Sequence, residues 1–421
     1  MVYVQIPRSK ARVARDFRPP LGSASVHLDA LRGLAAISVM YAHWWDAFYA
    51  SYSNLPSRNP ILAAAYCYSA FGHAWVIVFF VLSGYLVGGS VLRAMKNRNW
   101  SWRAYLLARF TRLYVVLLPA LLLGAALYWA GMHLNGAETL YSGHSGMGAL
   151  YFNVYSTLTP KVFVNSLLFM DTKGAAAFGS NGPLWSLSHE FWYYIAFPIL
   201  AIALSKGQRF WIRGVTVLAL MAWAWLVGGY KVALFPTWLM GVLILYMPPF
   251  PTRSPWSQPW IRRLAIAISL ALLLVAFVLR ANGSLFPDST LTVGRSHWHP
   301  PISDILLSPV VALFIWVVLQ CAPGRLSAAY AWLAQRAAGS SYTLYLVHLP
   351  AIIFLKAFFH IPRAIPSWQT FPFNLAMFLI VFLYAQLVYL LFERKTDWVR
   401  QRIKPYVMGQ IGAKDSALPN E

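Results

Sequence analysis

The sequence predicts an all-α, polytopic integral membrane protein with about ten transmembrane helices and both termini in the cytoplasm. Of its 421 residues, 59% are hydrophobic and only 11% are charged, whereas charged residues make up about 25% of a typical soluble domain. Apolar stretches of ~20 residues, the length that spans a bilayer, recur along the chain. The basic residues lie mostly in short connections between these stretches, which is how topology is encoded.

Ten apolar stretches are long enough to be candidate spans. In order they cover roughly 29–50, 70–92, 105–130, 184–204, 211–229, 232–248, 263–280, 304–322, 341–359 and 372–393. The fifth and sixth meet at Gly228-Gly229, so this region is either one broken pair or two short helices.

The distribution of Lys and Arg indicates the orientation. With the N-terminus inside, 26 of the 34 basic residues fall on the cytoplasmic side and eight fall outside. Basic residues resist translocation, so this bias places both termini in the cytoplasm, and an odd number of spans would destroy it. The net charge of +22 therefore reflects topology and contact with membrane lipid, and we expect no nucleic-acid partner.

The pattern divides the chain into three parts. Residues 1–28 form a basic cytoplasmic segment without the apolar core of a cleavable signal. Residues 29–393 form the transmembrane domain, with 131–183 as a large extracytoplasmic loop that we expect to make a cap or a re-entrant structure. Residues 394–421 form a cytoplasmic tail that is basic, then polar, and that we expect to be frayed.

The first span carries the most informative pair of polar residues. Arg32 and His43 are 11 residues apart, nearly three helical turns, so they project from the same face with ~16 Å between them along the axis. Arg32 would bind an anion near the inner surface, and His43 would act as a titratable base nearer the outer surface. Asp46 could orient the imidazole. The alternative is a topological anchor and an interfacial histidine.

Polar residues in the second and third spans add a candidate donor-binding region. Ser83 and Gly84 lie mid-span, where small residues allow close helix packing or leave room for a narrow channel. Arg109 and Arg112 are three residues apart and point the same way at the inner end of the third span. They are suited to phosphates, or to topology and anionic lipid alone.

Two later spans bring further ionisable residues into the membrane. Glu190 lies within an apolar stretch, an expensive position for a carboxylate that points to a functional site. Ser188 and Tyr193 lie close to it in the sequence and are candidates for contacting or orienting an acceptor. His348 in the ninth span belongs with them, unless it is a hydrogen-bonded core histidine.

The sequence predicts no bound metal. His297 and His299 form a pair in an outer loop, and two histidines alone make an incomplete site. Cys67 and Cys321 show no metal-ligand spacing.

Four blocks in this order resemble membrane acyltransferase family 3 over residues 28–393. They are LDALRGLAAISVMYAHWW (28–45), FFVLSGYL with ARFTRLY (79–86 and 108–114), PLWSLSHEFWYYIAFP (183–198) and SYTLYLVH (341–348). The resemblance implies that 29–393 is an acyltransferase domain, in a bacterial inner membrane.

The resemblance also implies a reaction. The donor would be cytoplasmic acyl-CoA, most often acetyl-CoA, as a co-substrate with no permanently bound cofactor. The acceptor would be a hydroxyl of a cell-surface, exported or lipid-linked carbohydrate. Arg32 and His43 match the family's essential pair, with His43 as general base or acyl carrier. Arg32, Arg109, Arg112 and Ser83 would bind the donor, and Glu190 would orient or stabilise the histidine.

Two alternatives stay open at this point. The enzyme could instead acylate a lipid-linked intermediate or small metabolite at the cytoplasmic face with the same residues. A chain with intramembrane His, Glu and Arg could also be a transporter of a glycan or hydrophobic molecule, although it lacks the inverted repeat that many transporters show.

Overall fold

The computed structural model describes most of the chain. The described residues are 22–57, 59–143, 147, 150, 153–171, 177–250, 255, 258–283, 291–293, 296–298, 301–321 and 326–409. Most of the basic N-terminal segment predicted at 1–28, the end of the tail at 410–421 and His299 of the predicted histidine pair lie outside them.

Each of the ten predicted spans coincides with a helix or a continuous helical segment. These are α1 (Ser23–Phe48), α3 with η2 and α4 (Gly72–Ser83, Gly84–Gly88 and Gly89–Lys96), α5 (Trp102–Met132), α9 (Leu184–Leu204), α10 (Phe210–Val227), α11 (Gly229–Ile244), α12 (Pro259–Ala281), α13 (Ile302–Cys321), α15 (Ser341–Phe358) and α16 (Phe371–Leu391). The predicted fold class, an all-α polytopic membrane protein, is confirmed.

Among the described residues, eight helical segments are long and apolar enough to cross a membrane. The other two predicted spans are α1 and α11. Helix α1 has 26 residues but carries several charged and histidine side chains, and α11 has only 16. The helix that holds the predicted Arg32–His43 pair is therefore also the most polar of the ten, as expected for a helix that carries a site within a membrane protein.

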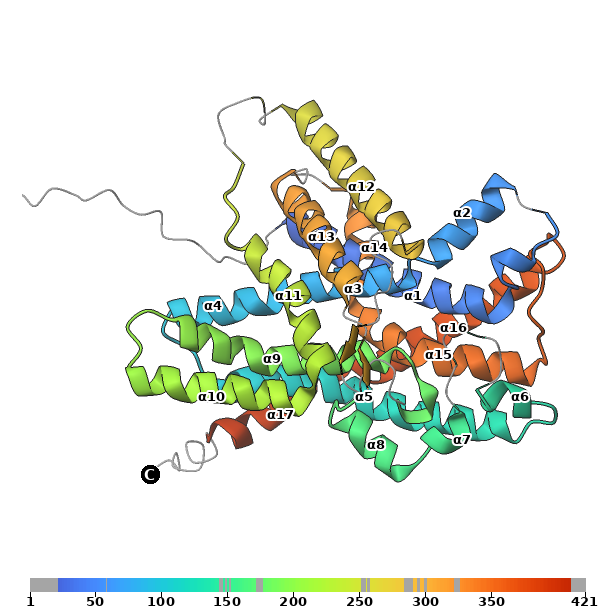
Figure 1. Ribbon diagram of the computed structural model, residues 1–421, viewed down its shortest axis with the longest axis horizontal. Coiled ribbons are helices and arrows are strands. Elements are labelled where there is room, and N and C mark those ends of the chain that lie inside the picture. Colours follow the sequence, from blue (N-terminus) through green and yellow to red (C-terminus); the bar gives the residue numbers. More distant parts are fainter. Residues whose placement is uncertain are drawn as a thin grey trace, which may run out of the picture.

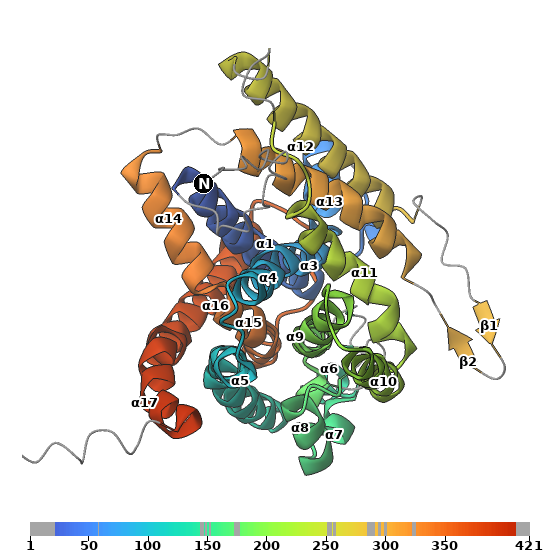
Figure 2. The same cartoon turned by 90° about the vertical axis from the view of Figure 1, so that its left-hand side faces the viewer.

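Helices α1 and α3 occupy the middle of the bundle. Figure 2 looks along the helices and shows α5, α15, α16 and α14 (Ala328–Gly339) on one side of this pair, α9 to α11 on another, and α12 with α13 on a third. In Figure 1 the α4 and α17 ends of the bundle lie on the left, and α2 (Pro60–Ser69) and α6 (Glu138–Tyr141) lie on the right. Helix α1 contacts α3, α14 and α15 directly.

Glycines shape two points of the bundle. Gly228 has φ 82°, a left-handed conformation that favours glycine, and it separates α10 from α11 as two helices. Gly84 and Gly241 bring α3 and α11 into backbone contact, since a Cβ at Gly84 would lie 1.9 Å from the Trp238 carbonyl oxygen and one at Gly241 2.0 Å from that of Val81. The close approach predicted at Gly84 is confirmed.

The loop predicted at 131–183 re-enters the bundle. Its described parts contain α6, α7 (Val154–Thr157), α8 (Pro160–Leu167) and η3 (Phe178–Ser180). After α8 the chain reaches the middle of α5, where the Tyr114 hydroxyl donates to the Leu167 carbonyl at 2.9 Å. Asn181 then donates to the carbonyl of Leu346 in α15 at 3.0 Å. Irregular backbone at this depth is tolerated because protein groups satisfy it.

Four features were not predicted. They are α2, α14, a small antiparallel hairpin of β1 (Leu291–Val293) and β2 (Ser296–Trp298), and an ordered start of the tail. The tail was expected to be frayed, but residues 393–408 form the turn η5 (Glu393–Lys395) and the helix α17 (Thr396–Met408). Helix α17 packs along α5, which holds this amphipathic segment against the bundle.

Candidate active site

A cavity of about 510 Å³ runs between α1, α3, α5, α9 and α15 and is closed on one side by η5 and α17. Its charged lining groups are five arginines and three carboxylates: Arg32, Arg109, Arg112, Arg394, Arg400, Glu190, Glu393 and Asp397. We call the part of the cavity that holds the arginines the basic end. An excess of guanidinium groups over carboxylates makes it a site for an anion.

Arg32 reaches the cavity from α1. Its Nη2 donates to Asp29 Oδ1 at 2.7 Å, one turn earlier on the same helix, and about a quarter of its side chain is exposed. Arg32 lines the cavity beside this pair. The face of α1 that was predicted to carry Arg32 and His43 therefore lines the cavity at the position of Arg32.

Arg109 and Arg112 both line the cavity from α5, as their spacing predicts. The Arg109 guanidinium lies 5.7 Å from the ring centroids of Tyr105 and Tyr194, in a cation–π arrangement that fixes its direction. Its Nε is buried and has no hydrogen-bond partner among the residues that the structure describes. A buried donor without a partner is costly, so an anion bound here would relieve an existing penalty.

A directional chain of hydrogen bonds crosses the cavity wall. Trp238 Nε1 can only donate, and it donates to Ser83 Oγ at 3.2 Å. Ser83 Oγ then donates to the Tyr194 hydroxyl at 3.3 Å, and that hydroxyl donates to Glu190. The chain fixes Glu190, which was predicted to orient His43, on Tyr194 instead. Ser83 lines the cavity, as expected of a donor-binding residue.

The opposite end of the cavity is less charged. It reaches Val76 of α3, Ser186 of α9 and Tyr345 of α15, and the hydroxyls of Ser186 and Tyr345 share a hydrogen bond of 2.6 Å. The Tyr345 ring lies with its centroid 6.1 Å from that of His348, one turn further along α15. The cavity therefore ends one side chain away from His348.

His348 holds His43 by a hydrogen bond of 2.7 Å between His43 Nδ1 and His348 Nε2. His348 Nδ1 lies 2.8 Å from the Leu344 carbonyl, which can only accept, so this nitrogen carries a proton. The Nε2 of neutral His348 must then accept, and His43 Nδ1 must donate. This arrangement leaves the lone pair of neutral His43 on Nε2, the state that a general base requires.

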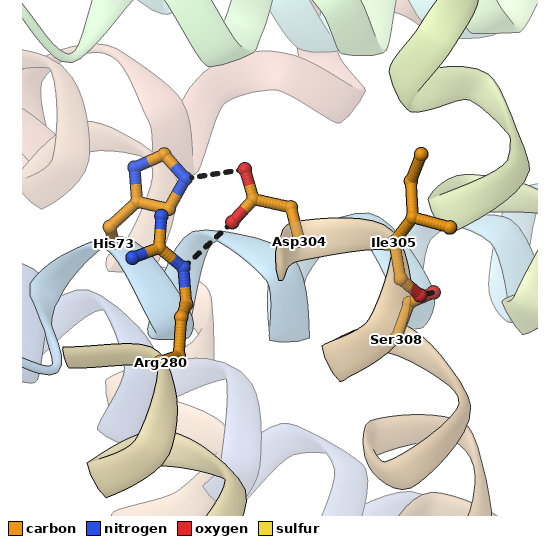
Figure 3. Close-up of polar contacts among 5 residues, drawn as sticks. All are labelled: His73, Arg280, Asp304, Ile305 and Ser308. Atoms are coloured by element: carbon orange, nitrogen blue, oxygen red, sulfur yellow. Dashed lines mark hydrogen bonds and ion pairs between the residues drawn. The ribbon is translucent and has the colours of Figure 1, made fainter. Parts of the chain in front are cut away.

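A cluster of His73, Asp304 and Arg280 lies beside the His43–His348 pair. Figure 3 shows Asp304 of α13 between His73 of α3 and Arg280 of α12, with His73 Nε2–Asp304 Oδ2 at 2.9 Å and Arg280 Nε–Asp304 Oδ1 at 2.7 Å. Only 2% of the Asp304 side chain is exposed. We call the region of His43, His348 and His73 the histidine end.

Close packing brings these histidines to the same level of the bundle. Gly72 of α3 lies against Ala42 of α1, where an added Cβ would be 2.6 Å from that of Ala42. His43 and His73 are the next residues along their helices. The His73 ring also stacks on Trp185 at 5.4 Å between centroids, next to Ser186 at the cavity's end.

Three predicted site residues have other partners. Asp46, expected to orient His43, pairs with Arg363 at 3.2 Å, and the hydrogen bond of His43 goes to His348. Ser188 donates to the Phe169 carbonyl of the re-entrant loop. Tyr193 donates to the Lys231 carbonyl of α11 at 2.7 Å. Ser188 and Tyr193 are buried and do not line the cavity, and their hydroxyls bind neighbouring backbone.

Sequence reasoning missed several residues that line the cavity, above all Tyr342, Tyr345, Ser186, Glu393, Arg394 and Arg400. A signal existed for Tyr345, which lies three residues before His348 and so shares its side of the helix. Ser186 could likewise have been placed with Glu190, four residues later. The arginines of the tail carried no signal, because a basic segment after the last span reads as topology.

The arrangement offers anion binding at one end and base chemistry at the other. The cavity between them is lined by aromatic and aliphatic side chains of α3 and η2, among them Phe79, Leu82 and Val87. A ligand with a polyanionic head and a thin arm that ends in a reactive group fits this distribution of charge.

The chain belongs to acyltransferase family 3, because the family model described as an acyltransferase domain matches residues 26–390. Membership in a family of acyltransferases sets the transporter alternative aside.

Curated relatives agree with this family. The chain is 26% identical over 182 residues to the O-acetyl transferase of Shigella phage Sf6, covering 43% of this chain and 47% of the relative. It is 24% identical over 204 residues to Nodulation protein 10 of Rhizobium leguminosarum bv. viciae, covering 47% and 50%. The chain thus spans about half the length of these relatives. No solved structure matches it significantly.

Proposed function

We propose that the protein transfers an acyl group, most simply acetyl, from acyl-CoA bound at the basic end to a hydroxyl of a cell-surface, exported or lipid-linked carbohydrate at the histidine end. An anion site and a histidine base at opposite ends of one cavity support this assignment. The name of the phage relative, an O-acetyl transferase, supports acetyl as the group and oxygen as the acceptor atom.

The donor's phosphates would be held by Arg32, Arg109 and Arg112. Guanidinium groups bind phosphate in a fork, and the buried Arg109 Nε lacks a partner in the described part of the chain. The thin pantetheine arm would follow the apolar wall of α3 past Ser83. Helix α1 is continuous from Ser23 to Phe48, so Arg32 and His43 are ~16 Å apart along its axis. The donor must extend over this distance to bring its thioester to the histidine end.

His43 Nε2 would take the proton of the acceptor hydroxyl. The hydroxyl oxygen then attacks the thioester carbonyl, the carbon–sulfur bond breaks, and the thiolate of coenzyme A recovers the proton from His43. The products are the O-acyl ester and free coenzyme A. If His43 acts instead as an acyl carrier, the same Nε2 lone pair attacks the thioester first, and free coenzyme A appears before any acceptor is added.

His348 would act as a positioning residue. Its Nε2 accepts from His43 Nδ1, which keeps the His43 lone pair on Nε2 and stabilises the positive charge that develops when His43 takes a proton. This is the role that a carboxylate plays in a serine hydrolase triad.

The distribution of basic residues supports a cytoplasmic basic end, since a bacterial inner membrane keeps Lys and Arg on its inner side. The acceptor would then approach from outside. Single cysteines beside His43, probed with a membrane-impermeant maleimide, test this orientation. Labelling of intact cells from outside is expected, whereas labelling only in inverted vesicles would favour acylation at the cytoplasmic face.

The His43–His348 hydrogen bond, placed one side chain beyond an arginine-lined cavity, carries the proposal. Its test is a deletion strain complemented with wild type, His43→Ala or Arg32→Ala, followed by mass spectrometry of surface glycans. We expect one acyl mass on a defined sugar to disappear in the deletion and to return only with the wild type. Equal restoration by well-expressed His43→Ala would refute the proposed role.

A further inference from the structure

The turn η5 and helix α17 form a wall of the cavity, and none of the predicted donor-binding residues lies on this wall. Arg394, Thr396, Asp397 and Arg400 line the cavity from this segment. Their position is fixed at two places. Glu393 accepts from the backbone nitrogen of Thr343 at 3.0 Å and from its hydroxyl at 2.6 Å, at the first turn of α15, and α17 packs along α5.

The arginines of this wall are more available than those deeper in the cavity. Arg394 is exposed and makes no hydrogen bond or ion pair with any residue that the structure describes. Arg400 pairs with Asp397 at 2.8 Å, but 42% of the Arg400 side chain and 75% of the Asp397 side chain are exposed. An exposed pair of this kind is worth little, so a phosphate can replace the carboxylate at low cost.

The two groups of arginines lie at different depths. Arg32 and Arg109 have buried Nε atoms. Arg394 is exposed, as is 42% of the Arg400 side chain, and we call this exposed part of the basic end, on η5 and α17, its outer rim. A donor whose anionic groups are spread along a nucleotide would meet both groups at once, whereas a single phosphate would meet only one.

We propose that Arg394 and Arg400 recognise the 3′-phosphate of the coenzyme A donor and so make η5 and α17 a specificity element for 3′-phosphorylated nucleotides. The inference rests on the donor proposed above. The 3′-phosphate is a monoester with a charge of about −2 near neutral pH, and it lies at the end of the molecule furthest from the thiol. With the thiol at the histidine end, that phosphate lies at the outer rim of the basic end.

The test compares coenzyme A with 3′-dephospho-coenzyme A. Dissociation constants are measured for both by isothermal titration calorimetry on the full chain in nanodiscs. Wild type is expected to bind coenzyme A about tenfold or more tightly than the dephospho form, the range for a lost charge-assisted contact. In the double variant Arg394→Gln/Arg400→Gln this ratio is expected to fall to within about twofold of one, with affinity for the dephospho form unchanged.

Two further variants serve as matched comparisons. Arg402→Gln removes the same charge from α17, but Arg402 lies over Trp398 at 5.1 Å and outside the cavity lining, so it is expected to keep the wild-type ratio. Asp397→Asn removes the carboxylate that competes for Arg400 and is expected to raise the ratio about twofold.

The outcomes separate this inference from the proposed donor. If wild type binds neither nucleotide, the donor assignment fails and this inference fails with it. If wild type binds coenzyme A but does not discriminate against the dephospho form, or if the double variant discriminates as wild type does, only the role of α17 is overturned. An equal loss in Arg402→Gln would indicate a general charge effect and would also overturn it.

Discussion

At the basic end, the arginines that line the cavity come from α1, α5, η5 and α17, and several of them keep guanidinium donors that bind no described residue, whereas at the histidine end each ring is held by a partner. His43 is fixed by His348, and His348 by a backbone carbonyl. The difference matches what each end has to do. An anion site binds its ligand through guanidinium groups that are not already paired. A general base needs a fixed tautomer and a fixed direction of its lone pair.

The histidine end should be the less tolerant of substitution. His43→Gln is expected to lower acyl transfer about 1,000-fold, within the range for removing a general base, because an amide is too weak a base to take up the acceptor's proton. The measurement is coenzyme A release in the presence of acceptor. Coenzyme A affinity should stay within about twofold of wild type, since His43 does not line the cavity. Residual activity above a tenth of wild type would contradict the assignment.

His348 should have a smaller effect that depends on what replaces it. His348→Phe removes the acceptor for His43 Nδ1 and is expected to lower transfer about 100-fold. His348→Gln keeps an amide oxygen that can accept, and it is expected to recover about a tenth of the wild-type rate. Rates and pH profiles of both variants provide the measurement. Equal rates in the two variants would mean that His348 supports packing alone.

The basic end should respond in binding instead of rate. Arg109→Gln is expected to raise the KM for acetyl-CoA about tenfold or more, the range for a lost hydrogen bond to a charged group, with kcat little changed. The exposed Arg103 on the same helix does not line the cavity, so Arg103→Gln is the matched control and should leave KM unchanged. A fall in kcat with constant KM would place Arg109 in the chemical step.

The smallest effect is expected at the cluster of His73, Asp304 and Arg280, and it is an effect on stability. Asp304→Ala leaves His73 and Arg280 without their shared carboxylate, and since both are about a fifth exposed we expect a loss of about 1–3 kcal/mol. It would appear as a lower unfolding temperature in scanning fluorimetry. Arg280→Ala should cost less, because it leaves the His73–Asp304 contact in place. An unchanged unfolding temperature in Asp304→Ala would show that the cluster does not tie α12 and α13 to α3.

Most of the fold could be predicted from the sequence because a continuous apolar stretch marks each span. Apolar length placed all ten helices within a few residues, and even the break at Gly228 followed from its glycines. The polar face of α1 was accessible for the same reason, since helical spacing alone puts Arg32 and His43 on one side. The prediction of a frayed tail was wrong because α17 is stabilised by its contacts with α5 and by Glu393, and not by an apolar length of its own.

The site was predictable only as a set of polar residues and not as a set of pairs. Asp46 was favoured as the partner of His43 because it is three residues away, but it pairs with Arg363, 317 positions further on. Ser188 and Tyr193 were favoured for lying near Glu190, but their hydroxyls donate to the carbonyls of Phe169 and Lys231.

The sequence by itself determined the helical membrane architecture, its ten apolar segments, the arginines of α1 and α5, and the histidine of α1, because hydropathy and helical period are local properties of the chain. Only the tertiary structure decided that His348 fixes His43 across 305 positions, that Glu190 is bound to Tyr194, and that α17 closes the cavity. These contacts depend on which helix faces packing brings together. Gly72, Gly84 and Gly241 allow the helices to approach closely because a glycine has no Cβ.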